Sequence, residues 1–205
     1  MPSIDQKREQ FTAFFLIAHP IKANVLPCSE QQRKYSLQEF EMHMPYAFKI
    51  AGEMSEIQSQ TLKPLRKLGE QLEDLVDYLQ FQARKIDLMM SYILQQQDQD
   101  EHQATALKFG GGGVVIGFDS ASSKLPEVGD ASVIKLFLET ESAAIYCFAE
   151  VIELNTNDNQ TEVSYIYTHI REQDQELLVR ASLHLQTLAL RKHHAEKRQN
   201  NEEDK

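Results

Sequence analysis

The stretch LRKLGEQLEDLVDYLQFQARKIDLMMSYILQQ, residues 65–96, keeps a seven-residue apolar repeat along its whole length. One heptad position is always apolar: Leu65, Leu72, Leu79, Ile86 and Ile93. The position three residues later holds Leu68, Leu75, Gln82, Met89 and Gln96. Because a straight α-helix drifts away from a strict seven-residue repeat, this pattern predicts a helix that supercoils against a partner helix. As a single helix, the stretch would form a rod about 48 Å long.

The apolar face of this predicted helix is wider than the seam formed by the two heptad positions. Further apolar residues extend it on both sides: Val76, Ala83, Met90, Tyr78 and Tyr92. A wide stripe favours bundles of three or four helices over a pair, and Gln82 can set the register because a buried amide needs a partner amide. The pattern therefore predicts a homo-oligomer. The alternative that it leaves open is an amphipathic hairpin packed on its own domain.

The composition limits the classes of protein to which this chain can belong. It has 205 residues, of which 41% are hydrophobic and 25% charged, with a net charge of −10. This acidic balance argues against a nucleic acid polymer as partner. No apolar run approaches the roughly 20 residues that span a bilayer, and no secretory signal is evident, so we expect a cytoplasmic protein without a membrane span. Cys28 and Cys147 are too few for a disulfide framework, and Cys147 is predicted to be a small buried apolar residue.

The first half of the chain divides into a predicted strand and a helical region. Residues 7–28 contain an apolar run from Phe11 to Ile17, which predicts a strand that continues as an extended segment toward Pro27. Residues 29–103 are rich in helix-favouring residues. Ser29 is a candidate N-cap, and we expect Pro64 to kink a continuous helix.

The second half of the chain has the pattern of a small antiparallel barrel. Short β-rich runs are separated by turn residues and cover 105–109, 114–118, 133–138, 145–154 and 162–170. A closing helix is predicted from about Asp174, so that residues 104–192 comprise the later strands and this helix. Residues 193–205 lose all apolar periodicity and are predicted to be a disordered tail.

Several short motifs give the chain a resemblance to the PilZ family, whose six-stranded barrels with a C-terminal helix serve bacteria as sensors of cyclic di-GMP. The motifs are the glycine-rich turn KFGGGGVVIGF (108–118), the step from Pro126 to Gly129, the ending LLVRASLHLQTLALRK (177–192), and KREQFT (7–12), which resembles the RxxxR start of the family. The resemblance implies an α+β fold, a small antiparallel barrel with long inserted helices between its first and second strands. Such an insertion resembles the atypical, tetramer-forming members, so a tetramer is favoured.

The same resemblance implies cyclic di-GMP as a ligand and shows where this chain departs from the family pattern. Arg8 matches the first arginine of RxxxR, but Thr12 replaces the second. In the [D/N]xSxxG turn, Lys108 stands at the acidic or amide position, Gly110 replaces serine and Gly113 is kept. Threonine lacks the planar fork with which arginine grips phosphate. Since each lost contact is worth about 1.5 to 3 kcal/mol, we expect binding to be weakened about 100-fold or more.

The residues leave a few functional alternatives open. Lys7, Arg8 and Lys108 can still form a phosphate site, although the glycines open a strand and indicate a structural turn. The histidines show no metal-ligand spacing and no catalytic constellation is evident, so we expect no enzyme, no metal and no cofactor. The chain is then either a cyclic di-GMP receptor or a degenerate, receptor-derived adaptor for an unknown protein partner. The alternatives are a helical scaffold without a nucleotide ligand, and a helical module beside an unrelated barrel should the early strand not pair with the later ones.

Overall fold

A computed structural model describes the backbone of residues 3–65, 73–97, 102–119, 125–138, 141, 143–157 and 160–203. Within these ranges, the side chains of residues 55, 56, 58–65, 73, 74 and 192–203 are outside the description. The helices are α1 (Ile4–Ala13), the 3-10 helix η1 (Gln32–Lys34), α2 (Leu37–His43), α3 (Tyr46–Leu65), α4 (Glu73–Gln95) and α5 (Glu172–Glu203). The strands are β1 (Ile17–Pro27), β2 (Gln103–Phe109), β3 (Gly113–Asp119), β4 (Ala131–Leu138), β5 (Ala143–Thr156) and β6 (Gln160–His169).

These six strands close into an antiparallel barrel in the order β1-β2-β3-β6-β5-β4, with β4 returning to β1. The early strand β1 pairs with both β2 and β4, so it is an integral part of the barrel. This excludes a helical module beside an unrelated barrel. Helices α2, α3 and α4 are inserted between β1 and β2, which confirms the insertion predicted from the sequence and the α+β fold class.

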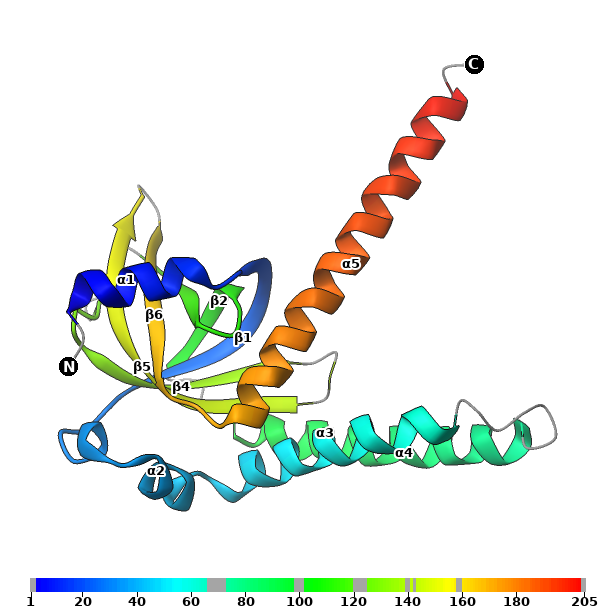
Figure 1. Cartoon of the computed structure of the whole chain (residues 1–205), viewed down its shortest axis with the longest axis horizontal. Coiled ribbons are helices and arrows are strands. Elements are labelled where there is room, and N and C mark those ends of the chain that lie inside the picture. The colour runs from blue at the N-terminus through cyan, green and yellow to red at the C-terminus, as the bar shows by residue number, and fades with distance from the viewer. Residues whose placement is uncertain are drawn as a thin grey trace.

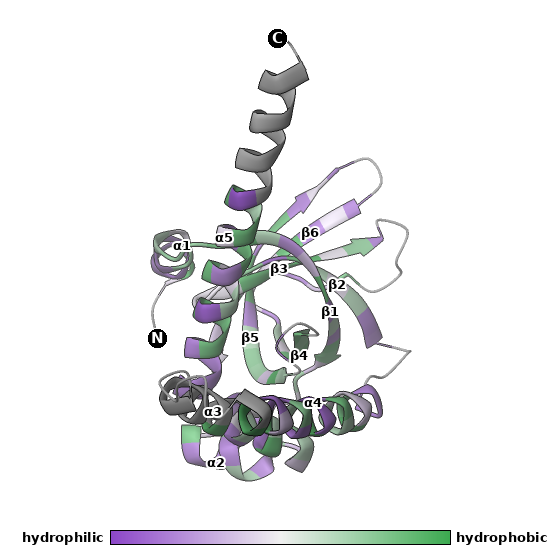
Figure 2. Cartoon of the chain, turned by 90° about the vertical axis from the view of Figure 1, so that its right-hand side faces the viewer, coloured by the Kyte–Doolittle hydropathy of each residue, from purple (hydrophilic) through white to green (hydrophobic). Residues whose placement is uncertain are grey.

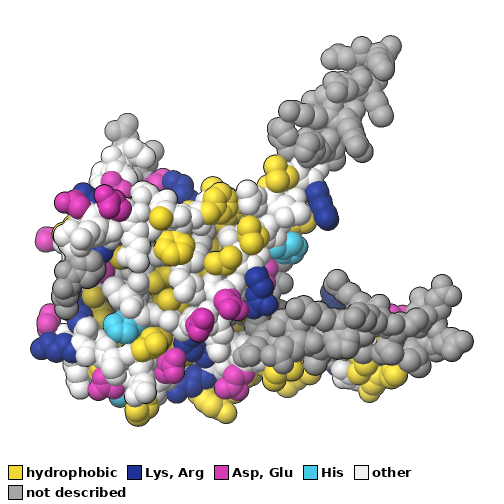
Figure 3. Space-filling model, in the orientation of Figure 1, with side chains coloured by type: hydrophobic (Ala, Val, Ile, Leu, Met, Phe, Trp, Pro, Cys, Tyr) yellow, Lys and Arg dark blue, Asp and Glu magenta, His cyan; other side chains and the backbone are white. Residues whose placement is uncertain are grey.

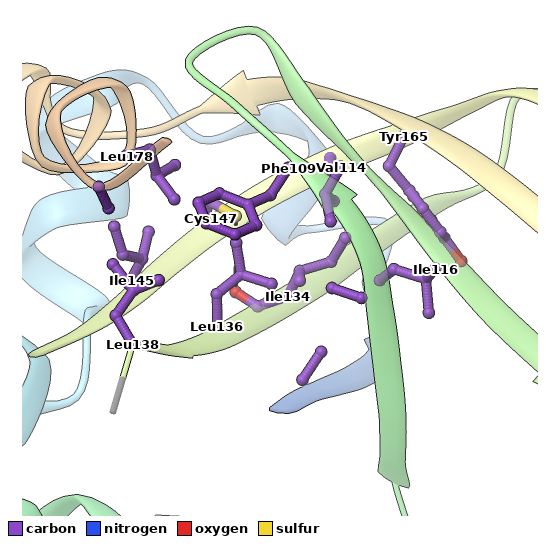
Figure 4. Packing of buried hydrophobic residues seen from close by; sticks show 14 of the residues in the cluster. Phe109, Val114, Ile116, Ile134, Leu136, Leu138, Ile145, Cys147, Tyr165 and Leu178 are labelled. Carbon is purple, nitrogen blue, oxygen red and sulfur yellow. Dashed lines mark hydrogen bonds between the residues drawn. The ribbon is translucent and has the colours of Figure 1, made fainter. Parts of the chain in front are cut away.

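The barrel interior is filled by alternate residues of the strands, together with the first turns of α5. Ile134 and Leu136 point inward from β4, and Ile145 and Cys147 point inward from β5. Leu178 joins the same cluster from α5, which lies against the barrel and then runs away from it (Figure 1). Figure 4 shows these side chains from β4, β5 and α5 packed close to one another. Cys147 is fully buried, as the sequence predicted.

The outer faces of β4 and β5 are buried as well, because helices cover them. Phe137, Tyr146 and Phe148 alternate with the interior residues and pack under α2, α3 and α4. The partners of these aromatic residues include Phe40 and Phe48, both fully buried. The three inserted helices lie together on one side of the barrel, whereas α1 lies apart from them (Figure 1, Figure 2). The outer faces of β4 and β5 and the inserted helices thus share a second apolar core, separate from the one inside the barrel.

The inserted region corrects the prediction of one continuous helix kinked at Pro64. Helix α3 ends at Leu65 and a separate helix, α4, begins at Glu73; the two lie side by side (Figure 1). The 23 residues of α4 make a rod of about 35 Å, shorter than predicted. Leu68 and Leu72 of the predicted seam lie outside the described residues, and Leu65 belongs to α3. No helix in the described ranges has an apolar stretch long enough to cross a membrane.

Ser29 is not the N-cap of an α-helix, which corrects the prediction made from the sequence. Its hydroxyl accepts a hydrogen bond from the Gln32 backbone N–H at 3.2 Å, and only the short η1 follows. The first α-helix of the insertion begins after Ser36, where Ser36 and Glu39 form a capping box. The hydrogen bonds from Ser36 lower the pKa of Glu39.

Both chain ends are helical where the sequence predicted otherwise. Residues 4–13 form α1, so the strand expected from Phe11 starts only at Ile17. The predicted disordered tail is helical as far as Glu203, since α5 continues through it. Seven of the eleven residues from 193 to 203 are alanine, glutamate, lysine, arginine or glutamine, all of which favour helix without requiring an apolar face.

Replacing Phe48 by alanine tests the shared core. Phe48 is fully buried, and its ring centroid lies 5.6 Å from that of Tyr146. Because truncation leaves a cavity between α3 and β5, we expect the free energy of unfolding to fall by about 3 to 5 kcal/mol, as measured in urea. The matched control is Tyr46→Ala on the same helix, where the side chain is 75% exposed and a change below about 0.5 kcal/mol is expected. Equal losses in the two variants would contradict the shared core.

Candidate functional site

The residues predicted to bind the ligand near the N-terminus lie on α1, a helix with a strong local start signal. Ser3 caps it: the Ser3 hydroxyl accepts a hydrogen bond from the Gln6 backbone N–H, and the Gln6 side chain accepts one from the Ser3 N–H. This capping box is a sequence signature of a helix N-terminus. It predicts a helix here, whereas the apolar run from Phe11 favoured a strand.

Lys7 and Arg8 are bonded within the protein. Lys7 Nζ lies 2.6 Å and 2.7 Å from the two carboxylate oxygens of Glu150 on β5. The Lys7 and Glu150 side chains are only 14% and 21% exposed. Arg8 Nε donates to the backbone carbonyl of Ile152 at 3.1 Å. Both cations of the predicted phosphate grip therefore hold α1 against β5.

The rest of α1 reinforces this attachment. Phe11 packs on Val115, Ile152 and Ile166 in an apolar cluster outside the barrel. Thr12, at the position of the second arginine, donates its hydroxyl hydrogen to the Glu9 carbonyl at 2.9 Å and so stays within the helix. The structure thus gives Thr12 a local backbone contact, and α1 serves as a cover for the outer barrel face.

Lys108 is also paired, with a different strand. Its Nζ lies 3.2 Å from a carboxylate oxygen of Glu162 on β6, and the two side chains are 43% and 29% exposed. Lys7 and Arg8 bind to β5, while Lys108 binds to β6. Each of the three cations proposed for a phosphate site thus has an acceptor within the chain.

The glycine turn is a packing junction between three parts of the chain. The Gly110 N–H donates to the Gly113 carbonyl at 3.1 Å and closes the turn between β2 and β3. A Cβ on Gly110 would overlap the carbonyl oxygen of Phe15, and one on Gly113 would overlap that of Tyr165. From α5, the Gln175 side-chain amide donates to the Gly111 carbonyl at 2.7 Å. Glycine is needed here for close backbone approach, which supports the structural interpretation of the turn.

The cysteines and the possible metal ligands were the remaining candidates for reactive groups among the described residues. Burial raises the pKa of the Cys28 and Cys147 thiols, which keeps them protonated and poorly nucleophilic. No group of three or more His, Cys, Asp or Glu side chains in the described ranges could hold a metal ion. The two segments predicted to form the ligand site, 7–12 and 108–113, do lie close together. Their contact is made by aromatic side chains and glycines, with Phe11 beside Gly113.

Substituting Glu150 by glutamine tests whether the Lys7 pair anchors α1. The change leaves a nearly buried ammonium without its carboxylate, so we expect faster hydrogen exchange over residues 4–13 and a loss of about 1 to 3 kcal/mol of stability. Exchange is measured by mass spectrometry and stability by urea unfolding. Glu162→Gln is the matched control, since its more exposed pair with Lys108 should contribute less than about 1 kcal/mol. Unchanged exchange in α1 of the Glu150 variant would contradict the anchoring role.

Comparison with known proteins gives no match by sequence but a likeness by structure. No model of a known protein family matches the chain, and no curated protein sequence matches it either. Among solved structures, it is similar to the Bacillus subtilis inhibitor of motility (MotI/DgrA), with 17% identity, a TM-score of 0.38, and 42% of each chain covered.

A second solved structure is similar over almost the whole chain. It is a pathogenic protein from Xanthomonas campestris, described as a new tetrameric PilZ domain that self-assembles through an unusual helical bundle. The identity is 14%, the TM-score is 0.55, and the match covers 89% of this chain and 96% of the other. Because of this coverage, the likeness cannot be restricted to the barrel. The chain therefore has a PilZ-like fold, as the resemblance of its sequence implies.

Proposed function

We propose that this protein is a non-catalytic, oligomeric adaptor of the PilZ type, which presents its barrels on a shared helical bundle and does not use the cyclic di-GMP site of the family. The observation that carries the proposal is the apolar face that α4 leaves uncovered. From α4, Met90 and Leu94 pack into the core between the inserted helices and the outer faces of β4 and β5. The predicted seam residues Leu75, Leu79, Ile86, Met89 and Ile93 are all exposed, and Gln82 is half-buried.

Large apolar side chains make up this uncovered face. Ile86 and Met89 are 50% and 67% exposed, at the middle of the seam. Hydrophobic side chains line the edge of the α3–α4 arm (Figure 3). Contiguous exposed apolar surface of this kind marks an interaction site. Helix α4 packs on its own barrel through residues beside the seam. The seam itself lies on a different face of α4 and is available for association with other copies.

The angular spread of the apolar residues favours more than two copies. With about 100° between successive residues, Tyr78, Phe81, Leu88 and Tyr92 form a second exposed stripe about 100° from the seam. A helix with two apolar stripes can contact two neighbours besides its own barrel, whereas a dimer covers one stripe. The Xanthomonas campestris protein of similar fold is described as a tetramer assembled through a helical bundle, and we propose a tetramer here.

A glutamate placed in the seam tests the assembly. Ile86→Glu is harmless in a single chain, where the side chain is 50% exposed, but it buries a charge in a bundle. We expect wild-type protein to have four times the chain mass of 23.6 kDa in light scattering, and the variant to dissociate. Gln80→Glu adds the same charge on the exposed polar side of α4 and should leave the mass unchanged. A wild-type protein that stays at the single-chain mass at micromolar concentration would overturn the assembly.

Titration with cyclic di-GMP tests the other half of the proposal. Since Lys7 and Arg8 already bind Glu150 and Ile152, we expect no heat of binding in calorimetry at ligand concentrations that saturate receptors of this family. Arg8→Ala should give the same flat titration. Measurable heat in the wild type that disappears in Arg8→Ala would instead support the receptor alternative.

A further inference from the structure

A groove opens where α2, the start of α3 and the junction of β6 with α5 meet. Its volume is about 630 Å³, within the range of pockets that hold a few side chains or a small molecule. Residues from all three parts line it, among them Glu41, Met42, Lys49, Glu53, Arg171 and Glu172. Acidic and basic side chains gather on this face beside the start of α5 (Figure 3). The groove shares no lining residue with α1 or the glycine turn.

The cations of the groove are already bonded within the protein. Arg171 donates to both carboxylate oxygens of Asp174, at 2.8 and 2.9 Å, and to the Phe48 carbonyl at 2.9 Å. The Asp174 side chain is only 1% exposed. Lys49 Nζ donates to the Met42 carbonyl at 3.2 Å. A Cβ on Gly52 would lie 2.5 Å from an Arg171 nitrogen, so glycine leaves room for the guanidinium.

The carboxylates at the rim are not neutralised in the same way. Glu41, Glu53 and Glu172 are exposed, and none of them forms an ion pair with a residue whose side chain the structure describes. Arg171 is neutralised by Asp174, so these three carboxylates face the single ammonium of Lys49. The groove therefore carries an excess of negative charge that attracts a cationic group.

Apolar side chains stand beside these carboxylates. Met42 lines the groove and is 69% exposed, and Met44 lines it as well. A flexible, exposed methionine is typical of a surface that adapts to an apolar partner group. Arginine combines a charged fork with an apolar stem and is enriched in the centres of protein interfaces.

We propose that this groove docks a basic segment of a partner protein: an arginine or lysine side chain enters between Glu41, Glu53 and Glu172, and an adjoining apolar side chain rests on Met42. The inference rests on the proposed adaptor role, for which it supplies the contact surface. The groove holds a few side chains, so the occupant is a short segment of the partner and not a folded domain.

A short capped peptide of alternating arginine and leucine, labelled with fluorescein, probes the groove of the full-length protein by fluorescence anisotropy. We expect saturable binding that weakens as salt is raised, because exposed charges are screened. The triple variant E41Q/E53Q/E172Q should weaken binding at least about tenfold. A peptide with neutral citrulline in place of arginine should show the same loss. All three glutamates are exposed, so the variant is expected to fold normally, which circular dichroism checks.

The matched control is E9Q/E127Q/E153Q, which removes the same charge from exposed positions elsewhere and should bind within about twofold of the wild type. If both triple variants weakened peptide binding equally, the effect would come from the net charge of the protein, and the proposal would be wrong. Absence of binding by the wild type, or displacement of the peptide by millimolar magnesium chloride at constant ionic strength, would overturn it as well. Light scattering of the same sample tests the tetramer independently. If the peptide does not bind but the protein is still a tetramer, the docking proposal is wrong and the proposed assembly still stands.

Discussion

Burial of both faces of β4 and β5 is the constraint on which the rest of the structure depends. Their inward residues fill the barrel, while Phe137, Tyr146 and Phe148 on the outer side pack against the inserted helices. Tyr146 on this outer face is only 7% exposed, and its burial raises its pKa to about 12. Because the same strands serve both cores, the helical arm cannot leave the barrel without exposing aromatic side chains. The orientation of the arm is therefore a property of the folded chain itself.

The strands could be predicted from the sequence because their burial patterns are local. The runs on β4 and β5 are almost continuously apolar, as expected of strands covered on both faces, and their boundaries agree with the structure to within a few residues. The reversal of the chain between Leu65 and Glu73 was not predictable in this way. The seven-residue spacing continues from Leu65 to Leu79, so the repeat does not indicate that these two residues belong to different helices. Periodicity identifies a face, whereas the partner of that face depends on the tertiary structure.

The candidate site shows the same limit for charged residues. Lys7 and Arg8 fit a phosphate grip when only their neighbours in sequence are considered. Their acceptors are 143 and 144 residues away, and no local pattern announces such a contact. The capping box from Ser3 to Gln6 was visible in the sequence and would have placed both cations on a helix. The glycine-rich segment could be predicted to form a turn, but its contact with Gln175 of α5 could not.

These contacts have a consequence for any anionic ligand. A phosphate that binds Lys7 competes with Glu150, which contacts the ammonium through both carboxylate oxygens and is itself largely buried. Leaving that carboxylate without a partner costs about 2 kcal/mol, which weakens the ligand about thirtyfold. This loss adds to that from the missing second arginine at Thr12. A sensor needs groups that a ligand can recruit at low cost, whereas here α1, the glycine turn and Arg171 hold the parts of the molecule in one arrangement. Such a molecule is better suited to presenting surfaces at a constant geometry than to changing shape on binding a nucleotide.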